Sequence, residues 1–185
     1  TSTNGVAIDY YNILVIQNNG LIASAGNPVT GSGFGAGEIA DDAWTNTTSN
    51  PVNVVYAVEG VSTVMGCEGE VFTVILTINP EPFVTNPPSL AICSGSSTNI
   101  GLSANIPANF SWTIGTITGG ITGASAGSGS SINQVLTNPS NSTPGSVQYL
   151  ITPVSTGGNC SGNTFTLTVT VNPTPLVTNS PTLRI

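Results

Sequence analysis

A repeat with a period of 93 residues constrains this chain more than any other feature of its sequence. Residues 51–92 align with residues 144–185 without a gap, and 20 of the 42 aligned positions are identical. The identical positions include a tyrosine, a cysteine and an Asn-Pro pair, and a weaker match continues upstream. An ungapped match of this length indicates two tandem copies of one domain.

Each period contains short segments with the alternation expected of β-strands. Residues 72–78 and 165–171 alternate apolar side chains with threonine, as half-buried strands do. No segment has a convincing helical period, and turns rich in Gly, Ser, Pro and Asn separate the apolar runs. The sequence therefore predicts an all-β chain of tandem immunoglobulin-like β-sandwich domains. Further strands are expected at residues 54–58, 99–102, 109–114, 131–136 and 147–151.

The repeat also sets the expected domain boundaries. We expect a first sandwich at residues 1–80, a complete second sandwich at 81–173 and a separate segment at 174–185. That last segment aligns with the one that opens the second repeat, so the first repeat lacks an opening strand and has an unpaired sheet edge. Two interpretations remain open: the chain is a window from a longer array, or the tail of one copy completes the first domain of the next by strand addition. The residues expected in that inter-copy strand are Pro175, Leu176, Val177, Leu183 and Ile185.

Charge is sparse in this sequence, and its scarcity excludes several classes of function. Only one Arg and eight acidic residues occur among the 185, and the chain has neither Lys nor His. A catalytic imidazole, a His-ligated metal and a lysine-bearing phosphate loop are therefore excluded. The net charge of −7 also disfavours nucleic acid and anionic membrane surfaces as partners. No run approaches 18 apolar residues, so we expect no membrane span, and a structural or binding protein rather than an enzyme.

The three cysteines fall into two classes. Cys93 lies near the start of a period, whereas Cys67 and Cys160 lie near its end. One cysteine of each class per repeat gives an even number once the flanking segments are counted, which indicates disulfides and an oxidising, extracellular compartment. A bridge between Cys93 and Cys160 is the simplest pairing, but sandwich topology places these positions at opposite ends of the domain. The alternative is a bridge from one domain to the next, and both pairings remain open.

Three acidic residues, Glu38, Asp41 and Asp42, form the densest carboxylate group. Oxygen-rich loops can bind Ca²⁺, but the spacing here lacks the alternation of an EF-hand loop. The second repeat has Gln134 and neutral residues in the same place, which favours a solvated turn. We therefore expect no cofactor, with Ca²⁺ at these three residues as the alternative.

Trp44 is a candidate ligand contact. At an offset of 93, Thr137 occupies its position in the second repeat, so the shared core does not require this aromatic side chain. An exposed tryptophan beside an acidic loop would suit a glycan or another cell surface. Trp112, in contrast, falls on a predicted core strand.

The motifs of the second repeat resemble a known family. They are ICSGSSTNI at residues 92–100, FSW at 110–112, ITGAS at 121–125, CSG at 160–162 and VTVNP at 169–173. This combination resembles the PKD-like repeat of very large surface and secreted proteins of Bacteroidetes, including gliding-type adhesins. The first repeat is similar to the same family through residues 23–28, 38–46 and 79–80.

The resemblance implies a β-sandwich, export from the cell and a structural role, and it supplies no catalytic residues. The expected function is that of an extracellular repeat in the stalk or fibre of a bacterial surface adhesin, with domains joined head to tail. Its partners would be neighbouring repeats or other copies of the chain. Two alternatives remain: a self-assembling filament built by donated tail strands, and a module that binds carbohydrate or another cell surface.

Overall fold

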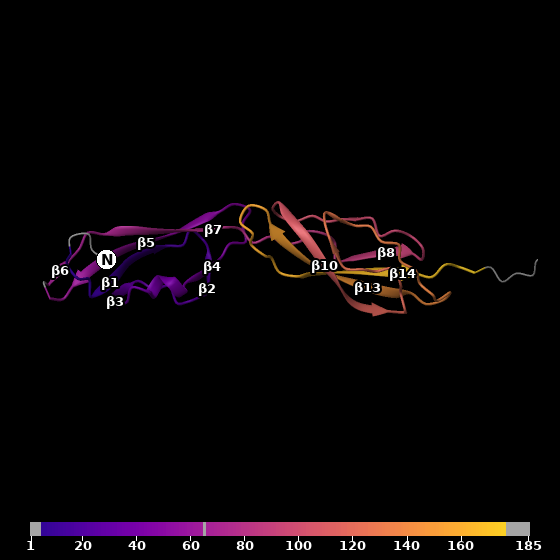
Figure 1. Cartoon of the computed structure of the whole chain (residues 1–185), viewed down its shortest axis with the longest axis horizontal. Helices are drawn as coiled ribbons and strands as arrows, with labels where there is room; N and C mark the ends of the chain where they lie inside the picture. The colour runs from indigo at the N-terminus through magenta and orange to yellow at the C-terminus, as the bar shows by residue number, and fades with distance from the viewer. Residues whose placement is uncertain (1–4, 65, 177–185) are drawn as a thin grey trace, which may run out of the picture. The chain divides into compact units, whose positions relative to one another are not determined.

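The computed structural model describes residues 5–64 and 66–176 (Figure 1). The chain divides into two compact units, Thr1–Glu81 and Pro82–Ile185, which are called unit 1 and unit 2 below. Among the described residues, every regular element is a β-strand except one short 3₁₀ helix. The prediction of an all-β chain of tandem sandwich domains is therefore confirmed.

The main sheet of unit 1 is built around its longest strand. β5 (Val52–Ser62) pairs antiparallel with β1 (Tyr10–Gln17) along one edge and with β7 (Phe72–Ile78) along the other. β3 extends the sheet beyond β1, and the short pair β2–β4 forms a second layer. The remaining elements are β2 (Ile22–Ala25), β3 (Gly31–Phe34), the 3₁₀ helix η1 (Glu38–Asp41), β4 (Ala43–Thr45) and β6 (Cys67–Glu68).

Unit 2 repeats this arrangement, except that its last long strand pairs with a strand on each side. Its main sheet has the order β11-β10-β13-β14-β8, in which β14 (Phe165–Asn172) lies between β13 (Gly145–Ser155) and β8 (Ser89–Cys93). The pairs are antiparallel except for β14 with β8, which are parallel. The smaller layer is the pair β12–β9. The remaining strands are β9 (Ile100–Gly101), β10 (Ala108–Thr118), β11 (Gly127–Ser128) and β12 (Ser131–Ile132).

The central strand of each unit supplies the middle of its core. Side chains alternate between the two faces of a strand, and in β13 every second residue is buried. Val147, Tyr149 and Ile151 on that face are fully buried, as is Tyr56 at the equivalent position of β5. The apolar and polar alternation of the sequence therefore marks the inward face of these strands correctly.

A buried asparagine closes the same loop in each unit, a feature that the sequence analysis missed. In unit 2, Asn138 Nδ2 donates hydrogen bonds to the carbonyl oxygens of Val171 at 2.8 Å and Thr143 at 3.0 Å. Asn46 makes the equivalent pair of bonds in unit 1. These bonds connect the loop before the central strand to the end of the last strand, and they fix the point at which the chain leaves each sheet.

Candidate functional site

The acidic residues of unit 1 do not converge on a metal-binding centre. Glu38 and Asp41 lie at the two ends of η1 and are exposed to solvent. Asp42 points instead toward the core, where its Oδ2 accepts a hydrogen bond of 2.6 Å from the hydroxyl of Tyr56. The described part of the chain holds no group of three or more His, Cys, Asp or Glu residues able to bind a metal ion. The geometry therefore gives the calcium hypothesis no support.

Trp44 is half-buried, so the hypothesis of an exposed ligand contact loses its premise. Its indole Nε1 donates a hydrogen bond of 3.0 Å to a core tyrosine, and its ring packs against the core of unit 1. The alignment with Thr137 is wrong by one position. The equivalent bonds of Asn46 and Asn138 show that the offset is 92 in this region, so Trp44 corresponds to Leu136, which is fully buried.

Each core holds a tyrosine whose hydroxyl is protected from ionisation. Tyr149 donates a hydrogen bond of 2.9 Å to Gln134 Oε1, and burial raises the pKa of Tyr149 from its usual value of 10.0 to about 12. The pKa of Tyr56 is also raised to about 12, first by burial and then by the hydrogen bond to Asp42. The equivalent core tyrosines thus donate a hydrogen bond to a glutamine in unit 2 and to an aspartate in unit 1.

These raised pKa values predict a loss of stability in alkaline solution. Between pH 10.0 and about 12, Tyr149 ionises in the unfolded chain but not in the folded one. The unfolded state then binds fewer protons, so the free energy of unfolding falls as the pH rises through this window and is unaffected below it. Urea titrations at several pH values measure the effect. The Tyr149→Phe variant is the control, because unit 2 should then lose less stability above pH 10.0; an equal loss with and without this hydroxyl contradicts the prediction.

The cysteines lie at opposite ends of unit 2, as the sandwich topology predicts. Cys93 pairs with Asn172 at the end of β14, whereas Cys160 precedes the start of β14 at Phe165. Eight residues of strand span roughly 26 Å, while bridged Cα atoms lie within about 7 Å. A Cys93–Cys160 bridge within one unit is therefore excluded by geometry. The thiols of the three cysteines form no disulfide in the described part of the chain, and the bridge between domains stays a prediction.

The most distinctive surface of unit 1 is the open edge of β7. Among the described residues, β7 pairs with β5 alone, whereas the equivalent strand of unit 2, β14, pairs with a strand on each side. Phe72 and Ile75 of β7 are 46% and 57% exposed. An unpaired strand edge with apolar side chains is a ready template for another strand.

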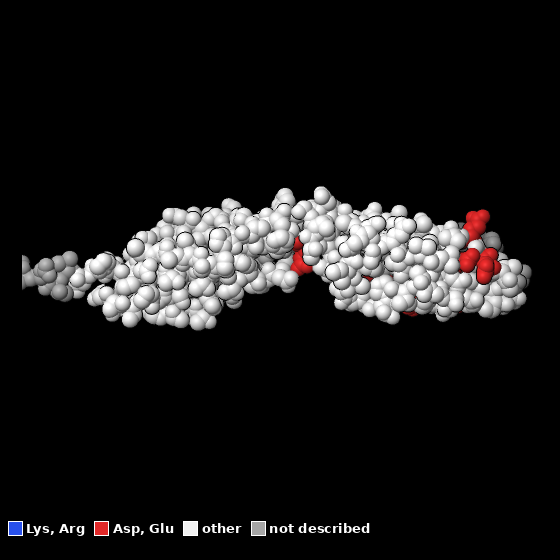
Figure 2. Space-filling view, turned by 180° about the vertical axis from the view of Figure 1, so that it is seen from behind, with Lys and Arg blue, Asp and Glu red and all other residues white. Residues whose placement is uncertain are grey.

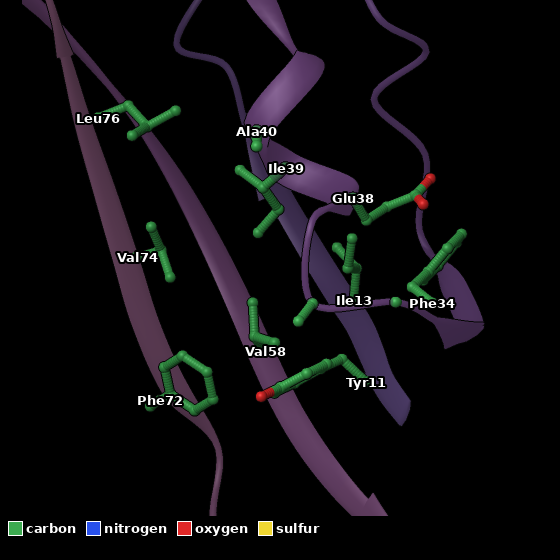
Figure 3. A pocket seen from close by; sticks show the side chains of 12 residues that line it. Tyr11, Ile13, Phe34, Glu38, Ile39, Ala40, Val58, Phe72, Val74 and Leu76 are labelled. Carbon is green, nitrogen blue, oxygen red and sulfur yellow. The ribbon is translucent and has the colours of Figure 1, made fainter. Parts of the chain in front are cut away.

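Beside this edge lies an apolar groove. It has a volume of about 380 Å³. Figure 3 shows side chains of β7 on one side and residues of η1 and β1 across from them. Almost all of the lining side chains are apolar, and Glu38 is the charged residue among them. The lining includes Tyr11, Ile13, Phe34, Ile39, Val58, Phe72, Val74 and Leu76.

In each unit a large sheet and a small pair of strands enclose one apolar core, an arrangement that defines immunoglobulin-like sandwich domains. Comparison with known families gives the class more closely. The family model described as a PKD-like domain matches residues 15–82 and 90–175, which make up most of the chain, and the chain belongs to this family. No curated protein matches it significantly. The described residues include no helix long and apolar enough to cross a membrane.

Proposed function

We propose that this chain is a structural, extracellular repeat of a bacterial surface adhesin of the kind found in Bacteroidetes, joined head to tail with neighbouring domains in a stalk or fibre. PKD-like domains are typically extracellular and non-catalytic, which supports this role. The absence of Lys and His supports a function without catalysis or a cofactor. The observation that carries the proposal is the arrangement of the first and last strands of unit 2.

These two strands, β8 and β14, run parallel and side by side. Their pairing covers five residues of each strand, from Ser89 with Thr168 to Cys93 with Asn172, and backbone hydrogen bonds of 2.9 Å extend it at both ends. Because the strands are parallel, the start of β8 and the end of β14 lie at opposite ends of the pair. These are also the points at which the chain enters and leaves the sheet.

Tension along an array of such domains acts on those two points. It slides β8 along β14, so the hydrogen bonds between the two strands are loaded together rather than broken one after another. Breaking several bonds at once needs more force than breaking the same bonds in sequence. Leu90 and Ile92 add to the resistance, since both side chains pack against the core of unit 2. Such a unit is suited to a load-bearing stalk.

Single-molecule pulling on the chain, held by handles at its two ends, tests this role. Unfolding of unit 1, from Tyr10 to Ile78, should release about 25 nm of chain, and unfolding of unit 2, from Ser89 to Asn172, about 30 nm. We expect the longer step at the higher force, because only unit 2 has the parallel pair among the described residues. The two lengths assign each event to its unit.

Two matched variants show whether β8 is responsible. Leu90→Ala removes a side chain that packs against the core, and it should lower the force of the longer step while leaving the shorter step unchanged. Ala91→Ser alters the neighbouring, exposed position and should change neither step. If unit 2 unfolds at the same force as unit 1, or if both variants behave alike, the load-bearing role is wrong.

A further inference from the structure

We propose that the open edge of β7, with the groove beside it, binds residues 175–185 of a second copy of this chain as an added parallel strand. The proposal deepens the structural role above, on which it rests, by naming the partner and the surface that join one copy to the next. Pro175 and Leu176 are exposed at the end of the described residues. Val177, Leu183 and Ile185 lie outside them, so their part is argued from sequence and from their counterparts in unit 2.

The inward side chains of β7 are more exposed than those of β14. Leu167, Val169 and Val171 of β14 are at most 2% exposed, because β8 and the core cover them. The residues 93 positions earlier, Val74, Leu76 and Ile78, are only half-buried. The equivalent strands have the same inward alternation, but its side chains are fully covered in unit 2 and partly exposed in unit 1.

The groove has room for the side chains that an added strand would bring. An engineered cavity of roughly 150 Å³ accommodates a benzene molecule, and the groove measures about 380 Å³. Val74 and Leu76 open onto it from β7, and Ile39 faces them from η1 (Figure 3). In unit 2, Leu90 and Ile92 of β8 pack against the core beside β14.

The tail of the chain resembles the segment of unit 2 that contains β8. Residues 175–185 align with residues 82–92, and 7 of the 11 positions are identical. Leu183 and Ile185 match the two residues of β8 that pack against the unit 2 core. By the register of β8 on β14, these side chains would lie beside Leu76 and Ile78 of β7.

A glycine in unit 1 leaves space for the residues that would begin the added strand. In unit 2, Pro82 is fully buried, and its carbonyl lies so close to Gly162 that any Cβ there would overlap it. Gly69 is the counterpart of Gly162, and each donates its backbone N–H at 2.9 Å to the residue at the same position of the repeat. The one atom within 4 Å of a Cβ at Gly69 is the backbone oxygen of Gly60 in β5, at 3.1 Å. Pro175, the counterpart of Pro82, has open space to occupy there.

Charge favours contact between the tail and unit 1 of another copy. All eight acidic residues of the chain lie within residues 1–81, and the one basic residue, Arg184, lies in the tail. Figure 2 shows the same asymmetry, since the visible face of unit 2 has no acidic side chain. Two copies of unit 1 repel each other, whereas the tail is attracted to unit 1. Arg184 replaces Ala91, an exposed residue of β8, so the added charge would face solvent.

The test compares two variants of the full chain that add the same charge to opposite faces of the tail. Leu183→Asp alters the face expected to enter the groove, and Thr182→Asp alters the outward face, like its exposed counterpart Ser89. Light scattering under reducing conditions should show masses above 18.6 kDa that grow with concentration for the unaltered chain and for Thr182→Asp. Leu183→Asp should remain a monomer at every concentration.

A synthetic peptide of residues 175–185 then probes the groove directly. It should bind the monomeric Leu183→Asp chain at one peptide per chain and dissociate the oligomers of the unaltered chain. The same peptide with Leu183→Asp should bind about a hundredfold more weakly, since it places a charge in an apolar site.

Three results would overturn the proposal. The first is an unaltered chain that stays monomeric and binds no peptide, and the second is oligomers that persist in Leu183→Asp. The third is an unaltered chain that is monomeric and binds the peptide only after Leu183→Asp, which would mean that the tail folds back onto its own unit 1. None of these measurements applies force, so the load-bearing role of unit 2 can stand if this proposal fails.

Discussion

Replacing Tyr149 with alanine should unfold unit 2 at urea concentrations that leave unit 1 folded. Tyr149 is fully buried at the centre of β13, among the apolar residues of the unit 2 core. Truncating a large buried aromatic side chain leaves a cavity and costs about 3–5 kcal/mol. A domain of this size has a total free energy of unfolding of roughly 5–15 kcal/mol, so the loss is a large part of it.

Fluorescence separates the two units, because the chain has two tryptophans, Trp44 in unit 1 and Trp112 in unit 2. In a Trp44→Phe background the signal reports unit 2 alone, and Tyr149→Ala should shift its urea midpoint strongly. Tyr149→Phe is the matched control. It removes one hydrogen bond and costs about 1 kcal/mol, because Gln134 still accepts from the backbone of Ser125 at 3.0 Å. Equal shifts for the two variants would show that the cavity is not the cause.

Gly162→Ala should strongly destabilise unit 2. A Cβ at this position overlaps the carbonyl of Pro82 and lies 3.0 Å from the ring of Pro153, and both prolines are fully buried. The segment that opens unit 2 must then move away from the sheet. Overpacking of a close backbone contact costs about 3 kcal/mol, and here it also weakens the entry of the chain into β8.

The matched substitution in unit 1 is Gly69→Ala. Its Cβ meets only the backbone oxygen of Gly60 in β5, at 3.1 Å, so we expect a cost below about 1 kcal/mol. Urea denaturation of each unit, followed through its own tryptophan, measures both values. If Gly162→Ala and Gly69→Ala destabilise their units equally, the contact with Pro82 does not hold the entering segment in place.

The strands and the core tyrosines could be predicted from the sequence because they depend on local alternation. The 93-residue offset correctly pairs Tyr56 with Tyr149 and the last strands of the two units with each other. The alternation of threonine with apolar residues in β14 follows the pleat of a strand buried on one face. Patterns of this kind report which way a side chain points without reference to any distant residue.

The position of Trp44 could not be predicted in the same way. The loop between Asn46 and β5 is one residue shorter than the loop between Asn138 and β13, so the offset changes from 93 to 92 upstream of it. Loop lengths carry no periodic signal, and the strong downstream match concealed the change. A signal was present, since an asparagine followed two residues later by a hydroxyl residue occurs in both copies, at Thr48 and Ser140.

The groove could not be predicted from the sequence either. The repeat pattern aligns β7 with β14, but it does not indicate how much space lies beside β7 or which side chains line it. The need for glycine at position 162 could not be predicted either, because it depends on the close approach of Pro82, 80 residues away in the chain. Such features follow from tertiary packing, which a single sequence does not display.

The pairing of β8 with β14 also determines how unit 2 must fold. Ser89 and Thr168 are neighbours in the sheet but lie 79 positions apart in the chain. Contacts between such distant residues form late and slowly, since a long loop must close before they are made. The sheet of unit 2 is therefore completed only after its last strand has been synthesised, so β8 waits without its partner while the intervening residues are being made.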